Sequence, residues 1–135
     1  MATIYFPNGG ELLMLESGLT GDNAWSVRLF TNDHTPGPQD TTPNYTEAAF
    51  AGYVPASLVR KGPAATDADG RAVQEYQMIE WHFTGNDPGP QLYGFFIVTP
   101  NGQLVCACRF DDPPITLSQN DPYLRVIPRL RPHNP

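Results

Sequence analysis

The sequence predicts an all-β domain, and three of its features indicate this class. The 135 residues include 15 prolines and 12 glycines, which favour turns over long helices. The apolar residues gather in short segments rich in β-branched and aromatic side chains, as is typical of strands. The clearest segment, residues 91–110, holds two apolar runs joined by a turn. Together these features predict an antiparallel sandwich or small barrel of about seven short strands, with one short helix near the N-terminus.

Residues 91–110 predict a β-hairpin whose first strand is buried on both faces. Phe96 and Val98 would point to one face of that strand, while Phe95 and Ile97 would point to the other. Apolar side chains on both faces are expected when a strand is covered from both sides.

The predicted hairpin turns at residues 99–102. Pro100 has the φ angle that the second position of a type I turn prefers, and Gly102 can adopt the left-handed conformation after it. This predicts a three-residue loop with a glycine bulge, and a two-residue Asn-Gly loop is the competing register. In the preferred register the facing pairs are Val98 with Leu104, Phe96 with Cys106, and Gly94 with Cys108.

The rest of the chain is expected to complete a single domain over residues 1–135. A short helix is predicted at residues 9–17, because Asn8 and Glu11 have the spacing of a capping box, and a strand is the alternative. Residues 131–135 are expected to form a mobile tail. The other segments with strand character are residues 2–7 (an N-terminal edge strand, or an arm that reaches a neighbour), 24–31, 50–59, 75–84, 115–117 and 124–130.

Two long loops are predicted between these strands. Residues 32–46 contain three prolines, and a loop of this length in a compact domain often lies at a contact surface. Residues 61–72 contain Asp67, Asp69 and Gly70, which match only part of a calcium-loop pattern and lack its closing glutamate.

The charge and the apolar pattern exclude several classes of partner. The net charge of −6 argues against nucleic acid, because a phosphate-binding face needs clustered Lys and Arg. No apolar run approaches the roughly 20 residues of a membrane-spanning helix. Residues 1–6 lack the basic start and long apolar core of a secretory signal. We therefore expect no nucleic-acid or membrane partner.

The cysteines predict buried thiols rather than a disulfide or a metal site. Cys106 and Cys108 are the only two, and residues two apart on a strand share a face but are poorly placed to bond each other. A lone C-x-C pattern without further cysteines or a histidine cluster is a weak metal signal. The sequence therefore predicts two reduced thiols in the core and no metal site.

No pattern in the sequence predicts an active site. His82 stands alone on a predicted strand, where a histidine is usually a packed or surface residue. Glu75 and Glu80 would point to opposite faces of a regular strand, which is poor geometry for paired carboxylates. Phosphate-loop, zinc and dinucleotide fingerprints are missing from the sequence. We therefore expect a protein that is not an enzyme, with no catalytic residues, no cofactor-binding residues and no cofactor.

Five segments in a fixed order carry a resemblance to a known group of proteins. They are NGGELLMLESGLTG, VRLFTNDHTP, YTEAAFAGYVPASL, QLYGFFIVTPNGQLVCACRF and NDPYLRVIPRL, and they span residues 8–130. In this order they resemble structural proteins of tailed-bacteriophage virions, which typically show a strand ending in "LFTN" before a Pro/Thr-rich loop and a "YG-F" hairpin. The chain departs from that pattern at His34 and in residues 36–43, so no function of this loop carries over. The pattern contains no catalytic residues.

The resemblance implies a virion protein made in the host cytoplasm. We expect a capsid decoration, or cement, protein on the outer surface of the head. Its expected partners are the major capsid protein and further copies of itself, as a dimer or trimer. One alternative is a tail, neck or baseplate subunit of the same virion.

Another alternative is a carbohydrate-binding attachment module. Trp25, Trp81, Tyr76 and Tyr93 would then line a sugar-binding face, although core packing is the more common role of such residues.

The expected partner-contacting residues fall in two segments, the N-terminal segment and the loop 32–46. They are Ala2, Thr3, Ile4, Tyr5, Phe6, His34, Thr35, Pro36, Pro38 and Pro43.

Overall fold

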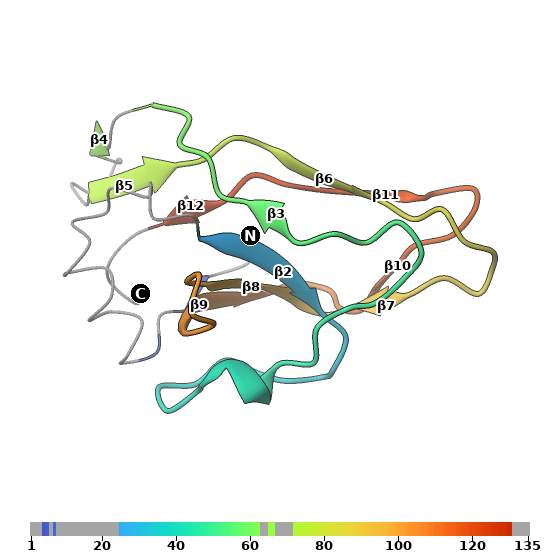
Figure 1. Cartoon of the computed structure of the whole chain (residues 1–135), viewed down its shortest axis with the longest axis horizontal. Helices are drawn as coiled ribbons and strands as arrows, with labels where there is room; N and C mark the ends of the chain where they lie inside the picture. Colours follow the sequence, from blue (N-terminus) through green and yellow to red (C-terminus); the bar gives the residue numbers. More distant parts are fainter. Residues whose placement is uncertain (1–3, 6, 8–24, 63–64, 67–71, 131–135) are drawn as a thin grey trace.

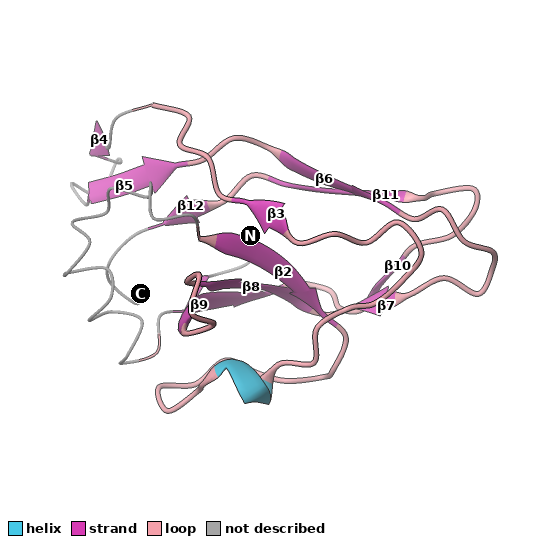
Figure 2. Cartoon of the chain, in the orientation of Figure 1, coloured by secondary structure: helices cyan, strands magenta, loops and turns pink. Residues whose placement is uncertain are grey.

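The computed structural model describes residues 4–5, 7, 25–62, 65–66 and 72–130 of the chain. In these ranges the regular structure is almost entirely strand (Figure 2), which confirms the all-β class. The exception is η1 (Thr42–Asn44), a single 3₁₀ turn. The helix predicted at residues 9–17 and the tail predicted at residues 131–135 lie outside the described residues.

The largest sheet has five antiparallel strands, with the predicted hairpin at its centre. Its order is β1 (Ile4–Tyr5), β9 (Leu104–Arg109), β8 (Gly94–Val98), β2 (Ser26–Phe30) and β3 (Ala56–Ser57). Every side chain of β8 is buried, which confirms that this strand is covered on both faces. The short strand β1 pairs with β9 of its own chain, so Ile4 and Tyr5 form an edge strand.

The hairpin turn has the predicted three-residue loop. The Thr99 amide donates a hydrogen bond to the Gln103 carbonyl (2.9 Å), and the Gly102 amide donates one to the Thr99 carbonyl (2.9 Å). Gly102 has a φ of 83°, the left-handed conformation that the turn requires.

The register of the hairpin agrees with the prediction only beside the turn. Val98 faces Leu104 as predicted, but Ile97 then faces Cys106, so Val105 is an extra residue on β9. This bulge moves the rest of the ladder by one position. The predicted pairs of Phe96 with Cys106 and of Gly94 with Cys108 are therefore wrong: Phe96 faces Ala107, and Gly94 faces Arg109.

A long two-stranded ribbon lies over one face of the five-stranded sheet (Figure 1). It consists of two paired segments: β6 (Ile79–His82) pairs with β11 (Tyr123–Val126), and β5 (Ala72–Glu75) pairs with β12 (Arg129–Leu130). The remaining described strands are β4 (Ala65–Thr66), β7 (Gln91–Leu92) and β10 (Ile115–Thr116).

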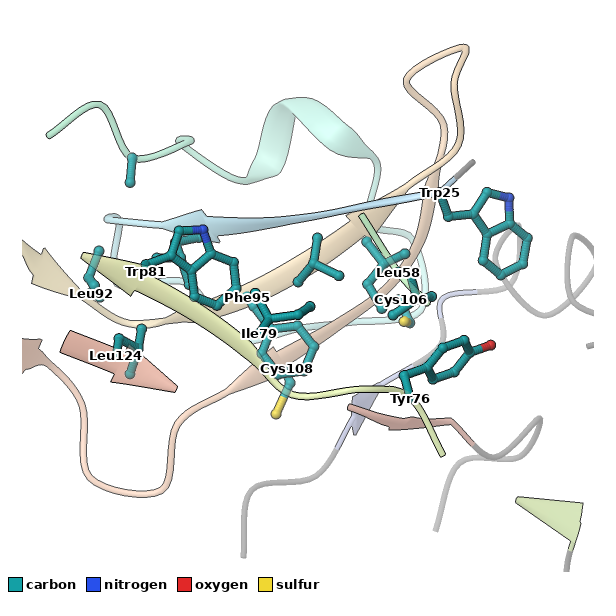
Figure 3. Close-up of a cluster of buried hydrophobic side chains, with 14 of the residues drawn as sticks. Trp25, Leu58, Tyr76, Ile79, Trp81, Leu92, Phe95, Cys106, Cys108 and Leu124 are labelled. Carbon is teal, nitrogen blue, oxygen red and sulfur yellow. The ribbon is translucent and has the colours of Figure 1, made fainter. Parts of the chain in front are cut away.

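The main core lies between the ribbon and the sheet. Figure 3 shows side chains from the ribbon, such as Trp81 and Leu124, gathered with Phe95 and Cys106 from the sheet. Burial of these apolar groups contributes roughly 25 cal/mol for each Å² removed from water. The two layers are therefore held together mainly by this shared interior.

The ribbon departs from the single strand predicted at residues 75–84. In a single regular strand Tyr76 would share a face with Met78 and His82, but its side chain is fully buried while theirs are exposed. The reason is that Gln77 and Met78 are both exposed, so one extra residue shifts the alternation between β5 and β6.

The opposite face of the sheet is also covered. On a regularly alternating strand Phe30 would share a face with the half-buried Ser26 and Arg28, but it is fully buried in a second cluster with Phe96 and Tyr45. Tyr45 belongs to the loop 32–46, which lies against this face, opposite the ribbon. At its Phe30 end, β2 is therefore covered on both sides.

Among the described residues, no helix is long and apolar enough to cross a membrane.

Candidate functional site

The proline-rich loop 32–46 is fixed to the sheet by one aromatic side chain. Tyr45 stacks on Phe96, with ring centroids 5.3 Å apart and planes at 21°. It also meets Phe30 edge-on, with centroids 5.0 Å apart. Because these rings exclude water from one another, the inner side of the loop is part of the packed interior.

A polar cluster closes the loop around the hydroxyl group of Tyr45. The Tyr45 hydroxyl donates a hydrogen bond to Asp40 Oδ2 (2.7 Å), and the Gly37 amide donates another to the same atom (3.0 Å). His34 Nε2 lies 2.8 Å from this oxygen, and the His34 ring meets Tyr45 edge-on. One carboxylate oxygen thus joins three parts of the loop.

The cluster also sets the ionisation of its members. Burial opposes the charge of Asp40, but the hydrogen bonds from Tyr45, His34 and the Gly37 amide outweigh it and hold the pKa of Asp40 below its ordinary value. Burial, together with the hydrogen bond to Asp40, raises the pKa of Tyr45. At neutral pH the carboxylate is therefore ionised and the phenol protonated, which suits a fixed hydrogen bond rather than proton transfer.

The Arg109 side chain of β9 fixes the start of the loop. Its guanidinium donates a hydrogen bond to the His34 carbonyl (3.1 Å), forms an ion pair with Asp33 and lies 5.6 Å from the ring centre of Tyr93. A planar guanidinium is suited to such combined contacts.

Hydrogen bonds also fix the later part of the loop. The Thr42 hydroxyl donates to the Gly102 carbonyl of the hairpin turn (2.6 Å), and the Asn32 amide group donates to the Asn44 carbonyl (2.9 Å). The loop is thus joined to the sheet and to itself at several points.

The structure separates the predicted contact residues of this loop into two groups. His34 and Pro36 are half-buried, and His34 serves the internal cluster. Thr35, Pro38 and Pro43 are exposed and remain available for contact. The fixed loop thus presents a polar and proline-containing outer surface.

Of the contact residues predicted in the N-terminal segment, the structure describes Ile4 and Tyr5. Ile4 and Tyr5 are half-buried in β1 at the edge of the sheet, and Ile4 packs against the main core. Ala2, Thr3 and Phe6 lie outside the described residues.

The sequence prediction missed the residues that hold the loop, namely Asp40, Tyr45 and Arg109. The one usable signal was Tyr45 itself, an aromatic residue in an otherwise polar loop. A second missed network joins residues 47–53 to β2. There, Glu47 accepts hydrogen bonds from Arg28 (2.9 Å) and from the Tyr53 hydroxyl (2.7 Å).

The aromatic residues offer no open sugar-binding face. The side chains of Trp25, Trp81 and Tyr76 are at most 3% exposed. Tyr93 is half-buried and lies beside Arg109. A sugar stacks on an accessible ring face, so this finding removes the observation that favoured a carbohydrate-binding module.

The other candidate residues, His82, Glu75 and Glu80, make surface contacts and form no catalytic arrangement. His82 is exposed and stacks on Tyr123, with centroids 4.5 Å apart. Glu75 and Glu80 do not point to opposite faces as predicted, because the extra residue between β5 and β6 turns both outward. Within the described ranges, no three His, Cys, Asp or Glu residues come together as a metal site would require.

The two cysteines are free and buried, as predicted. Both lie in the main core, and their spacing of two residues on β9 puts them on the same face of that strand. Burial raises the pKa of each thiol, and for Cys108 it does so to about 12, with a smaller contribution from the charge of Asp111.

No family model, no curated protein and no solved structure matches this chain. The resemblance to structural proteins of tailed-bacteriophage virions therefore stays a prediction.

Proposed function

We propose that this chain is a structural protein of a tailed-bacteriophage virion that decorates the outer surface of the assembled head. In this role it binds the major capsid protein and stabilises the shell without performing a reaction. The order of the five sequence segments supports the virion assignment. The choice of the head surface rests on the size and shape of the domain and on its fixed loop.

The fixed loop 32–46 is the observation that carries the proposal. A free loop loses conformational entropy when a partner orders it, and this loss weakens binding. In this chain the Asp40 cluster, the Arg109 contacts and the buried ring of Tyr45 already hold the loop in one conformation. Its exposed residues can therefore meet a capsid lattice at little entropic cost.

Many copies of a modest interface suffice for such a role. A protein that binds only the assembled shell stabilises the shell by mass action, and each bound copy adds a similar amount of stabilising free energy. The small single domain suits this arrangement, since many copies can fit side by side on a lattice.

We also interpret the two facing layers as an antiparallel sandwich rather than a barrel. Within the described part of the chain, the five-stranded sheet ends at β1 and β3, each of which has one strand neighbour. A closed barrel would have no such edges.

The test uses particles of the phage that encodes the chain. This protein is removed from the particles, and purified wild-type or variant protein is then added back. We expect the double variant Thr35→Arg/Pro38→Arg to load at least about tenfold more weakly, because two bulky charges would stand on the contact surface. Co-sedimentation with the particles measures the loading. Both residues lie outside the Asp40 cluster, so the variant should remain folded.

The matched control is Thr116→Arg/Asn120→Arg, which places two arginines at exposed positions outside the loop. Normal loading of the Thr35/Pro38 variant would remove the loop from the interface. Cryo-electron microscopy of the complete particle then separates the alternatives: hundreds of copies on the head support decoration, whereas six or twelve copies at the tail or neck contradict it.

A further inference from the structure

The outward face of the long ribbon carries an ordered set of exposed side chains. Its rows are formed by residues that face each other across the two strands. In order along the ribbon, the rows are His82 with Tyr123, Glu80 with Arg125, Met78 with Ile127, and Glu75 with Arg129. Met78 immediately precedes β6 and Ile127 immediately follows β11, so these two residues continue the ladder by one position beyond the Ile79–Val126 pair.

The middle of this face is apolar. Met78 is 54% exposed and Ile127 is 57% exposed, and Tyr123 is exposed at the end of the ribbon. Isolated apolar side chains on a surface are ordinary, but three of the five large exposed apolar residues among the described ones lie on this one face.

The charges on the face are separated by strand. Glu75 and Glu80 lie on the β5–β6 strand, whereas Arg125 and Arg129 lie on the β11–β12 strand. Each acid pairs with the arginine across from it, at 2.7 Å for Glu80 with Arg125 and at 3.1 Å for Glu75 with Arg129. Glu75 also pairs with Lys61 Nζ (3.0 Å), so the negative character of the β5–β6 edge is clearest at Glu80. The opposite edge is positive, and the apolar row lies between the charged rows.

This pattern is self-complementary in one orientation. A two-fold axis parallel to the strands would place the β5–β6 strand of one copy over the β11–β12 strand of the other. Each Glu80 then meets the partner copy's Arg125, and each Met78 meets the partner copy's Ile127. A two-fold axis across the strands would instead stack Glu80 on Glu80 and Arg125 on Arg125, which like-charge repulsion opposes.

We propose that this face, defined by the four rows, binds a second copy of the chain in a symmetric dimer. The charge complementarity selects the partner, because a surface that matches itself row by row fits a two-fold interface. This proposal assigns a binding face to the dimer or trimer that the resemblance leads us to expect. Its test uses the isolated protein, so it stands or fails separately from capsid binding.

The experiment is sedimentation velocity of the full chain over a concentration series. Wild-type protein should show a monomer–dimer equilibrium. The single variants Glu80→Arg and Arg125→Glu should each weaken dimerisation at least about tenfold, because each places like charges against each other across the interface. Met78→Asp should do the same by placing a charge in the apolar row.

Mixing the two charge variants gives the decisive measurement. The Glu80→Arg chain carries arginine at positions 80 and 125, and the Arg125→Glu chain carries glutamate at the same two positions. Every arginine of one chain then meets a glutamate of the other, so a one-to-one mixture should form a heterodimer. Recovery in the mixture also shows that both variants are folded. Asp33→Arg is the matched control, because it reverses the acidic partner of an arginine on the loop side of the sheet and should dimerise as the wild type does.

Three results would overturn the inference. They are a wild-type chain that stays monomeric at every concentration, a Glu80→Arg variant that dimerises normally, and a mixture of charge variants that stays monomeric. If the wild type is monomeric while Glu80→Arg abolishes loading onto capsids, the face binds the capsid protein instead.

Discussion

Asp40 holds the proline-rich loop together through a single oxygen atom. The hydroxyl of Tyr45, the amide of Gly37 and the ring of His34 all meet Asp40 Oδ2, and the side chain is only 11% exposed. Hydrogen bonds to an ionised group are stronger than those between neutral groups. The charge of this one side chain therefore helps to fix the loop, in addition to the Arg109 contacts and the stacking of Tyr45.

This dependence predicts a loss of stability in acid. The pKa of Asp40 is lower in the folded protein than its ordinary value of 3.8, so the unfolded chain takes up a proton more readily. The contribution of Asp40 is therefore fully present above that ordinary value and is lost as the pH falls through the lower folded-state pKa. Urea denaturation between about pH 6 and pH 2.5 measures the effect.

Asp40→Asn is the matched variant, because it keeps the shape of the side chain and removes the charge. We expect it to be less stable than the wild type at pH 6, by about 1–3 kcal/mol, and to lose less further stability in acid. A wild type and a variant with parallel stability curves would show that the Asp40 charge does not hold the loop.

At the scale of single elements, the start of β8 approaches its neighbours very closely. A Cβ atom added at Gly94 would lie 2.0 Å from the Cys108 carbonyl oxygen and 2.6 Å from the Phe30 ring. Neither neighbour can move easily, because the first is backbone in β9 and the second is fully buried. Only glycine allows β8 to approach both.

Gly94→Ala should therefore lower the free energy of unfolding by at least about 2 kcal/mol, because the added methyl group must push two packed strands apart. The midpoint and slope of urea denaturation measure the change. Gly62→Ala is the control: a Cβ there meets nothing within 4 Å, so its effect should stay within about 0.5 kcal/mol. Equal stabilities of the two variants would contradict the close approach at Gly94.

The elements that sequence reasoning found best are those that local chemistry determines. Pro100 and Gly102 specify the hairpin turn, whatever surrounds it. The bulge at Val105 and the break at Gln77 were missed because each is an irregularity within an apolar or mixed run, where alternation alone shows no signal. Each of these irregularities shifts the following residues by one position and therefore changes the partners or the faces of their side chains.

The candidate site was found only in outline, for a similar reason. Length and proline content marked residues 32–46 as a loop at a contact surface. Tyr45 points inward because it packs against Phe30 and Phe96, which belong to other segments of the chain. These two rings come together only when the sheet forms. Tertiary contacts of this kind leave no periodic pattern in the sequence.

At the scale of the whole molecule, the layers share the central hairpin. One face of β8 and β9 contributes to the main core beneath the ribbon, and the other face contributes to the cluster beneath the loop 32–46. Because the same two strands support both layers, we expect the described domain to unfold as a single cooperative unit.

The two cysteines report on this cooperativity. Both thiols lie in the main core on β9 and are at most 3% exposed, and burial raises the pKa of each. An alkylating reagent attacks the thiolate, so the thiols should react only when the core opens. Short pulses of iodoacetamide over a urea series should therefore label both cysteines in the range where circular dichroism reports loss of the sheet.

A labelled reference makes this measurement quantitative. Asn120→Cys places a thiol at an exposed turn position, where it should react at once in the folded protein, with Cys106 and Cys108 still protected. The competing possibility is that β1, which has only two residues on the edge of β9, separates first and exposes Cys108, the residue that Ile4 faces. Labelling of Cys108 at urea concentrations below the main transition, with Cys106 unlabelled, would show this local opening and would contradict a single cooperative unit.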